Sequence, residues 1–323
     1  MKKFTQIRIR SLQPDSIQGV NIFIDVKKLI GILLMTWGLL FTSQAQQLPQ
    51  FTQFMFNDYV LNPAVAGTSP FYQVRAMSRF QWAGIVDAPQ TISLSINGPH
   101  SSKSMGFGGY LYNDVTGPTS RTGIYGTYAY NINVINDIRL SMGLSFGFLQ
   151  NTIDGTKINL HDPNDPVLKN TVYSSFVPDA SIGFYMYDKN WFAGFSAFQL
   201  FSNNLKVYDE KNGLNKLKKH YYLTGGYSFI LSNQFTIEPS LILKGTAHIP
   251  LQIDLNAKVV YLETAWLGFS YRSQDAASIL IGYVHNKKYY FGYAYDFSIS
   301  DFRHYNSGSH EIMIGLRFNP IKK

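Results

Sequence analysis

The chain has 323 residues, a formal net charge of +8 and no cysteine. The lack of cysteine excludes disulfides, thiolate nucleophiles and thiolate metal sites. Six basic and two acidic residues precede position 46, which leaves about +4 for the rest of the chain, and this weak, scattered excess does not indicate nucleic-acid binding.

A basic pair followed by an apolar run predicts an export signal. Lys27 and Lys28 precede an apolar stretch at 29–41, and Ser43-Gln44-Ala45 follows it. A basic region, a short apolar core and a small-x-small site make up a cleavable signal peptide. We therefore expect residues 1–45 to be removed after Ala45. The long stretch before Lys27 is unusual for such a signal, and a start assigned too early, with Val26 as the true initiator, is one explanation.

Residues 46–70 do not alternate cleanly between apolar and polar positions. Met55 to Leu61 is expected to form a short helical turn that stops before Pro63. We interpret 46–70 as a short periplasmic N-terminal segment with two compatible roles. It is either an arm that tucks into a barrel lumen or seals its periplasmic mouth, or a docking surface for a periplasmic partner.

Positions 71–318 are predicted to form one β-barrel, and 319–323 a short C-terminal tail. Alternation of period two places every second side chain on one face of a strand. Most of the segments are long enough to cross a bilayer when tilted. Fourteen segments fit this template: 71–82, 90–98, 104–112, 120–132, 138–151, 176–187, 191–201, 218–231, 235–244, 252–261, 264–272, 276–285, 289–298 and 309–318.

The outward face of these segments is apolar, as it is when lipid is the solvent. In 138–151, Leu140, Met142, Leu144, Phe146 and Phe148 alternate with Ser141, Gly143, Ser145 and Gly147. A soluble β-sandwich or lipocalin-like barrel also alternates, but it would place polar residues on its outer face. The pattern therefore favours an all-β, antiparallel outer-membrane barrel of about 14 strands.

Loop lengths support the same count. All the long connections, 152–175, 202–217 and 299–308, follow odd-numbered segments, whereas short connections follow even-numbered ones. Outer-membrane barrels have long outer loops and short periplasmic turns. An even count also returns the C-terminus to the periplasm, and closure satisfies every backbone polar group.

Charged residues predicted to face the lumen carry both signs. We expect them to pair across the lumen and rigidify the barrel, or to set ion selectivity if the lumen conducts. Besides Lys244, they are Arg139, Glu238, Asp254, Lys258, Arg272, Asp296, Glu311 and Arg317.

The sequence does not indicate an enzyme, a cofactor or a metal centre. Seven histidines are scattered without a His-x-x-x-His pair or a Gly-x-Ser-x-Gly elbow. His310 and Glu311 are neighbours on a strand and point to opposite faces, with His310 toward lipid. The acidic loop at 161–166 lacks the calcium-loop spacing, and its Asp, Asn and Pro are ordinary turn residues.

Several motifs occur in the order found in one known family. They are Gln50-Phe51-Thr52-Gln53-Phe54-Met55-Phe56-Asn57, Asn62-Pro63-Ala64-Val65-Ala66-Gly67, Arg79-Phe80-Gln81-Trp82-Ala83-Gly84, Tyr112-Asn113-Asp114-Val115-Thr116-Gly117-Pro118, Gly292-Tyr293-Ala294-Tyr295-Asp296 and Gly308-Ser309-His310-Glu311. Together they resemble the PorP/SprF-like proteins of Bacteroidetes over nearly the whole mature chain. Leu48 and Val65 depart from the acidic and aromatic residues expected there.

This resemblance implies a non-enzymatic outer-membrane component of the type IX secretion and gliding machinery. Its implied partners are a secreted surface adhesin with a C-terminal sorting domain, periplasmic and outer-membrane secretion components, and outer-membrane lipid. The alternative is a passive outer-membrane channel or hydrophobic-solute transporter, because fourteen strands leave room for a lumen. Candidate partner-binding residues within the motifs are Gln53, Phe54, Phe56, Asn57, Asn62, Pro63, Gly67, Arg79 and Trp82.

Overall fold

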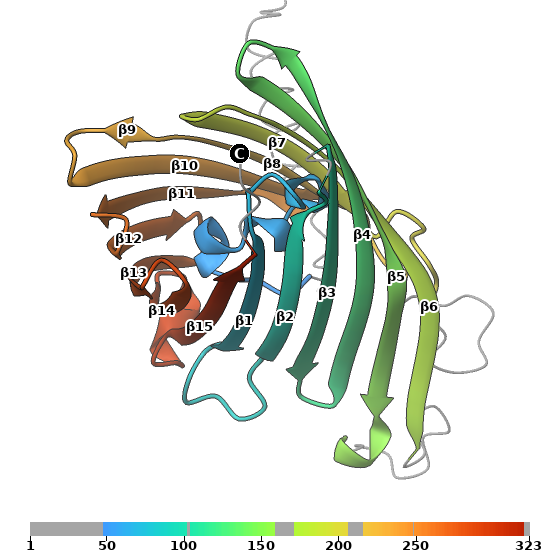
Figure 1. Cartoon of the computed structure of the whole chain (residues 1–323). Coiled ribbons are helices and arrows are strands. Elements are labelled where there is room, and N and C mark those ends of the chain that lie inside the picture. The colour runs from blue at the N-terminus through green and yellow to red at the C-terminus, as the bar shows by residue number, and fades with distance from the viewer. Residues whose placement is uncertain (1–47, 102–103, 159–170, 206–215, 248, 320–323) are drawn as a thin grey trace, which may run out of the picture. The chain divides into compact units, whose positions relative to one another are not determined.

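The computed structural model describes residues 48–101, 104–158, 171–205, 216–247 and 249–319. The described chain forms a closed antiparallel barrel with short 3-10 helices at its N-terminal end (Figure 1). None of the helices in this part of the chain is long and apolar enough to cross a membrane. The predicted signal peptide, residues 1–45, lies outside the described residues, as does the loop segment 161–166.

Fourteen strands form the wall, as predicted, because β8 and β9 are two parts of one strand interrupted at Ser228. The bounds are β1 Tyr72–Phe80, β2 Gln90–Pro99, β3 Met105–Thr116, β4 Thr119–Ile135, β5 Ile138–Asp154, β6 Val172–Tyr187, β7 Trp191–Phe198, β8 His220–Tyr227, β9 Phe229–Ile230, β10 Phe235–Thr246, β11 Ile249–Tyr261, β12 Ala265–Arg272, β13 Ala276–His285, β14 Tyr289–Ser298 and β15 Ser309–Phe318.

Each strand pairs with its neighbours in the chain, and the first pairs with the last. Tyr72 of β1 lies opposite Phe318 of β15, and Phe80 lies opposite His310. The sheet therefore has no free lateral edge where β1 and β15 meet. Closure of this kind satisfies backbone groups that hydrocarbon cannot hydrate.

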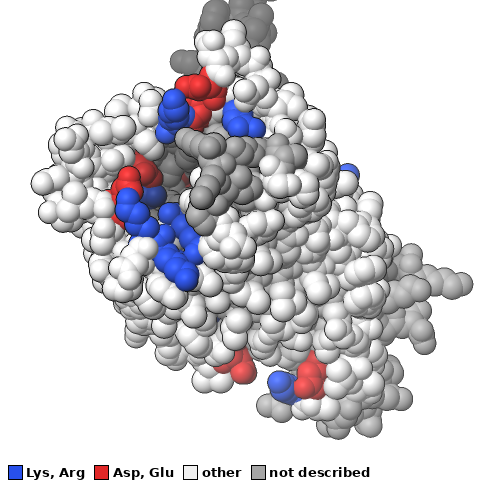
Figure 2. Space-filling model, viewed as in Figure 1, with Lys and Arg blue, Asp and Glu red and all other residues white. Residues whose placement is uncertain are grey.

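The alternation predicted for β5 is present in the structure. Met142, Leu144, Phe146 and Phe148 expose 37–53% of their surface, whereas Ser141, Gly143, Ser145 and Gly147 are buried toward the lumen. On the face seen in Figure 2, charged residues gather near the ends of the barrel and the wall between them is almost uncharged. An apolar outer band of this kind suits a lipid environment.

Connection lengths distinguish the two rims. Turns 136–137, 188–190, 262–264 and 286–288 lie at one rim, and the strand ends that precede the long connections, at residues 80, 154, 198 and 298, lie at the other. We call the first the inner rim and the second the outer rim, following the rule for outer-membrane barrels. Two inner turns have consecutive residues with positive φ, Leu262-Glu263 and Asn286-Lys287, which is the geometry of tight hairpins.

Several strand ends differ from the predicted ones. β3 continues to Thr116 and β6 begins at Val172, because the hydrogen-bonded ladder extends beyond the lipid-facing band. β7 ends earlier than predicted, at Phe198, because Gln199 and Ser202 adopt left-handed φ values of 57° and 49°. Such values interrupt an extended strand.

Candidate functional site: a lumen occupied by the N-terminal segment

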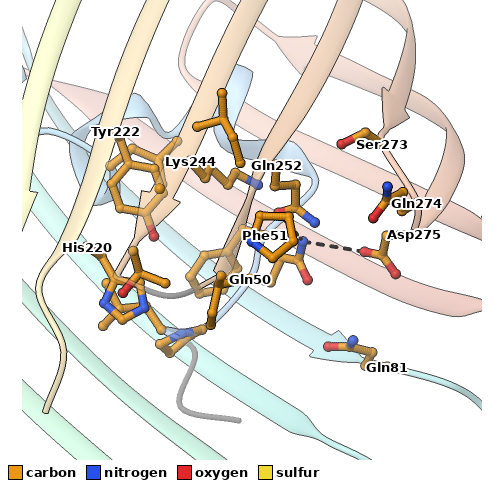
Figure 3. Close-up of a pocket in the computed structure, with 18 of the residues that line it drawn as sticks. Gln50, Phe51, Gln81, His220, Tyr222, Lys244, Gln252, Ser273, Gln274 and Asp275 are labelled. Atoms are coloured by element: carbon orange, nitrogen blue, oxygen red, sulfur yellow. Dashed lines mark hydrogen bonds between the residues drawn. The ribbon is translucent and has the colours of Figure 1, made fainter. Parts of the chain in front are cut away.

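Residues 51–67, which we call the plug, run through the lumen from the outer to the inner half of the barrel. Gln50 Nε2 lies 3.5 Å from Asp275 Oδ2 in an outer turn (Figure 3). At the other end, Gly67 lies against Gly106 at the inner end of β3. Three 3-10 helices form the plug: η1 Gln53–Phe56, η2 Asp58–Val60 and η3 Pro63–Val65. Residues 51–67 of the predicted periplasmic segment are thus held inside the barrel.

The start of the plug is held by a buried carboxylate of the wall. Glu311 accepts hydrogen bonds from the backbone N–H groups of Thr52, at 2.7 Å, and Gln53, at 2.9 Å. Glu311 therefore takes the place of an N-cap side chain, because the first N–H groups of a helix have no partner within it. The Thr52 hydroxyl lies 2.9 Å from both carboxylate oxygens of Asp296.

Arg79 joins these two carboxylates. Its Nη2 lies 2.7 Å from Asp296 and its Nη1 lies 3.2 Å from Glu311, and all three side chains are at most 2% exposed. Nη1 also donates to the Thr52 hydroxyl at 2.9 Å. One arginine thus links β1, β14, β15 and the plug. Charge-assisted hydrogen bonds of this kind are strong and directional when water is excluded.

A second arginine extends the network around the wall. Arg272 lies 3.1 Å from Asp275, 3.4 Å from Asp254 and 3.6 Å from Asp296. Lys244 lies 2.6 Å from the same Asp254 oxygen. Opposite charges are needed here because isolated ions are costly to bury. The outer half of the lumen is therefore organised by ion pairs.

The middle and end of the plug bind the wall through uncharged groups. The Asn57 amide donates to Ser95 at 3.0 Å, and Tyr59 and Thr127 share a hydroxyl hydrogen bond of 2.7 Å. Asn62 donates to the Phe184 carbonyl at 3.0 Å. Its oxygen accepts from Ala64 N and so caps η3, which begins with Pro63.

Glycines on the wall make room for the plug. A Cβ added at Gly143 would overlap Pro63 and Ala64, and one added at Gly183 would overlap the Asn62 side chain. Glycine therefore allows the plug backbone to lie directly on the strands.

Gly143→Ala should weaken docking of the plug by about 1–3 kcal/mol, because the new methyl group meets backbone rather than a movable side chain. Amide hydrogen exchange in residues 51–67 should then become roughly 5- to 150-fold faster. Gly126→Ala is the matched control, since no atom lies within 4 Å of that Cβ position. Unchanged exchange in Gly143→Ala would contradict the docked arrangement.

Asp58 makes docking of the plug dependent on pH. Burial raises the pKa of its carboxyl from 3.8 to about 6, and the nearby Lys258 and Arg75 oppose this rise only in part. The docked plug therefore holds a proton that the free plug loses above pH 4. We expect docking to weaken by up to about 3 kcal/mol as the pH rises from about 4 to about 6.

Hydrogen exchange of the plug, corrected for its intrinsic pH dependence, measures this effect. Asp58→Asn should remove the slope between pH 4 and 6, and Asp301→Asn, in an exposed outer helix, should leave it unchanged. A slope that survives in Asp58→Asn would assign it to other groups.

The structure places most of the predicted partner-binding residues against the barrel's own wall. Gln53, Phe54, Asn57, Asn62 and Arg79 are each at most 5% exposed, Pro63 and Gly67 are buried, and Phe56 and Trp82 are partly buried. In this arrangement the plug residues contact the wall of the lumen. The accessible part of the set is Trp82 at the outer rim.

The residues predicted as lumen charges fall into more than one group in the structure. Asp254, Arg272, Asp296 and Glu311 belong to the outer network. Glu238 and Lys258 are direct cross-strand partners 2.5 Å apart. Arg317 stacks between Phe71 and Tyr290, 4.3 and 4.1 Å from their ring centroids. Arg139 is partly buried near the inner rim.

Sequence reasoning missed the role of Arg79. The alternation of β1 contains the signal, because Gln73, Arg75, Met77 and Arg79 occupy the buried row. The separation of His310 and Glu311 is confirmed: Glu311 is buried, and His310 bonds Tyr293 at 2.7 Å on the outward face. Among the described residues, no group of three or more His, Asp or Glu side chains is placed to hold a metal ion.

The solved structures to which this chain is similar include outer-membrane barrels. The toluene transporter TbuX of Ralstonia pickettii is 8% identical, with a TM-score of 0.52, over 80% of this chain and 92% of that chain. The CymD monoaromatic hydrocarbon channel is 12% identical, over 85% of this chain and 95% of that chain. Its TM-score of 0.46 is too low to support a structural inference. At this identity TbuX indicates the fold alone.

A comparison with curated proteins found no match. A family model does match, over residues 43–316, which includes the plug and nearly all of the barrel. This family and the barrel fold are not enzymatic types, and both place the protein in the outer membrane. The chain belongs to the PorP/SprF family of type IX secretion system membrane proteins.

Proposed function

We propose that this protein binds a secreted surface protein with a C-terminal sorting domain and helps to export or anchor it. The barrel acts by binding, without catalysis, as an outer-membrane component of the type IX secretion and gliding machinery. Its outer rim meets the client, and its inner rim meets the periplasmic machinery.

One observation supports this role over transport: the lumen is occupied by the protein's own plug. Phe51, Phe54 and Tyr59 are each at most 5% exposed, and the plug is bonded to wall strands around the barrel. A wall that holds a plug this firmly is suited to serve as a rigid membrane anchor. Rigid elements position binding surfaces better than mobile ones do.

Charged side chains at the inner rim support contact with a partner there. Lys189 and Lys287 are 77% and 79% exposed and form ion pairs with Asp137 and Glu263. Exposed ion pairs contribute little to stability. These groups are thus available to exchange partners with a periplasmic protein.

Deletion of the gene in its native host tests the proposal, with surface and secreted proteins compared by mass spectrometry. We expect the loss of one large surface protein, retained inside with its sorting domain uncleaved, and its recovery on complementation. Loss of all cargo with sorting domains would instead make the protein a core part of the machine. Unchanged cargo would contradict the secretion role.

The second candidate is a passive channel or a transporter of hydrophobic solutes. It is favoured by the fold shared with TbuX, whose name describes a toluene transporter. The intact barrel would then have to pass ions or apolar solutes with the plug in place, and conductance measurements on the purified protein separate the two functions.

A further inference from the structure

Two adjoining cavities lie at the outer rim, with volumes of about 330 and 410 Å³. Both are lined by Leu48, Pro49 and Gln50 before the plug and by Gln81 and Trp82 after β1. We call the two cavities together the outer vestibule. Each volume falls within the range of small-molecule sites, about 300–1,000 Å³.

Four glutamine side chains belong to the polar lining of the cavity of about 330 Å³, which is shown in Figure 3. Gln50, Gln81, Gln252 and Gln274 come from four separate segments and lie around one space, with Tyr222 on the far wall. A glutamine amide both donates and accepts hydrogen bonds. A ring of such groups matches a ligand whose hydroxyls also do both.

Charged side chains that line the vestibule already have partners within the protein. Lys244 is paired with Asp254 at 2.6 Å, and Asp275 with Arg272 at 3.1 Å. In the second cavity Asp114 accepts from Thr91 at 2.6 Å, and Arg121 donates to Asn151 at 3.1 Å. This arrangement favours an uncharged ligand over a phosphate or a carboxylate, because a charged ligand would have to compete with these existing partners.

Trp82 lines both cavities and has a strained backbone conformation. Its φ is 52°, a left-handed value that costs a bulky residue about 1–2 kcal/mol. The backbone N–H of Trp82 donates a hydrogen bond to Ser309 Oγ at 3.1 Å, and the backbone N–H of Ala83 donates to the Gly308 carbonyl. The Trp82 ring packs edge-on against Phe302, with ring centroids 4.7 Å apart. Strain held by its surroundings in this way clusters at functional sites.

We propose that the outer vestibule binds an uncharged carbohydrate chain. A sugar ring presents C–H bonds on its face and hydroxyls at its edge, so its face packs on the Trp82 indole while its hydroxyls bond the glutamine amides. Because Trp82 lines both cavities, consecutive sugars could occupy one cavity each and both contact it. The same chemistry is offered by the glycan of a surface lipid and by a glycan on an exported protein. The inference does not rest on the proposed secretion role.

Calorimetric titration of the full chain in nanodiscs with maltotriose and mannotriose tests the class of ligand. We expect binding that weakens about tenfold in Trp82→Ala and about fivefold in Gln252→Ala. Trp191→Ala and Gln234→Ala are matched controls at the inner rim and should bind as the wild type does. Heat-modified mobility on gels confirms that each variant is folded.

Two further titrations distinguish the possible sources of the ligand. One uses the delipidated polysaccharide of the host's surface lipid, and the other uses glycans released from the host's exported proteins. If either of them binds more tightly than the trisaccharides, and if this binding also depends on Trp82, the result supports the proposal and identifies the source of the ligand. No binding of any neutral glycan at millimolar concentration would overturn it. Binding that is equal in wild type and Trp82→Ala, or binding of unglycosylated peptides alone, would overturn it as well.

Discussion

Removal of the plug, residues 51–67, should convert a closed barrel into an ion-conducting pore. A barrel of fourteen strands has an interior wider than its own side chains fill, and the described segment that occupies this space is the plug. In planar bilayers the wild type should pass little current, whereas the deletion variant should pass at least about tenfold more current per protein.

A cysteine pair provides a second variant with the chain intact. The protein has no native cysteine, and the side chains of Asn57 and Ser95 touch at 3.0 Å. Asn57→Cys with Ser95→Cys should be cross-linked by a short bifunctional reagent and remain closed. A single Asn57→Cys variant is the control. High conductance of the intact, cross-linked protein would contradict closure by the plug and favour the channel function.

Arg79→Ala should be the most destabilising single substitution in the network, by about 3–5 kcal/mol. It leaves Asp296 and Glu311, which are 2% and 0% exposed, without their shared cation. It also removes the shorter of two arginine hydrogen bonds to the Thr52 hydroxyl, so the plug should loosen together with the barrel. Urea unfolding followed by heat-modified mobility measures the loss.

Two comparisons make this result specific. Lys189→Ala removes the exposed pair with Asp137 and should change stability by less than about 1 kcal/mol. Arg79→Met combined with Asp296→Asn and Glu311→Gln should recover part of the loss, because neutral groups are less costly to bury than unpaired ions. If Arg79→Ala were as stable as Lys189→Ala, the network would not hold the fold.

The sequence alone determined the number of strands and which of their side chains face outward or inward. In β5, for example, Leu144 and Phe146 face outward and Ser145 inward, because alternation is a local property of an extended chain. Strand ends were less certain, since the periodic signal reports contact with lipid while the ladder continues past it, as β3 does to Thr116.

Only the tertiary structure decided where residues 48–70 lie. Thr52 and Glu311 are 259 positions apart, and they meet because β15 closes against β1 and the chain turns back into the lumen. Short 3-10 helices do not show the apolar periodicity of a strand or an α-helix, so the sequence does not indicate which surface they contact. The same closure brings Arg79 to Asp296 and Gln81 to the outer vestibule. Contacts across a barrel depend on its closure, and no local pattern in the sequence encodes them.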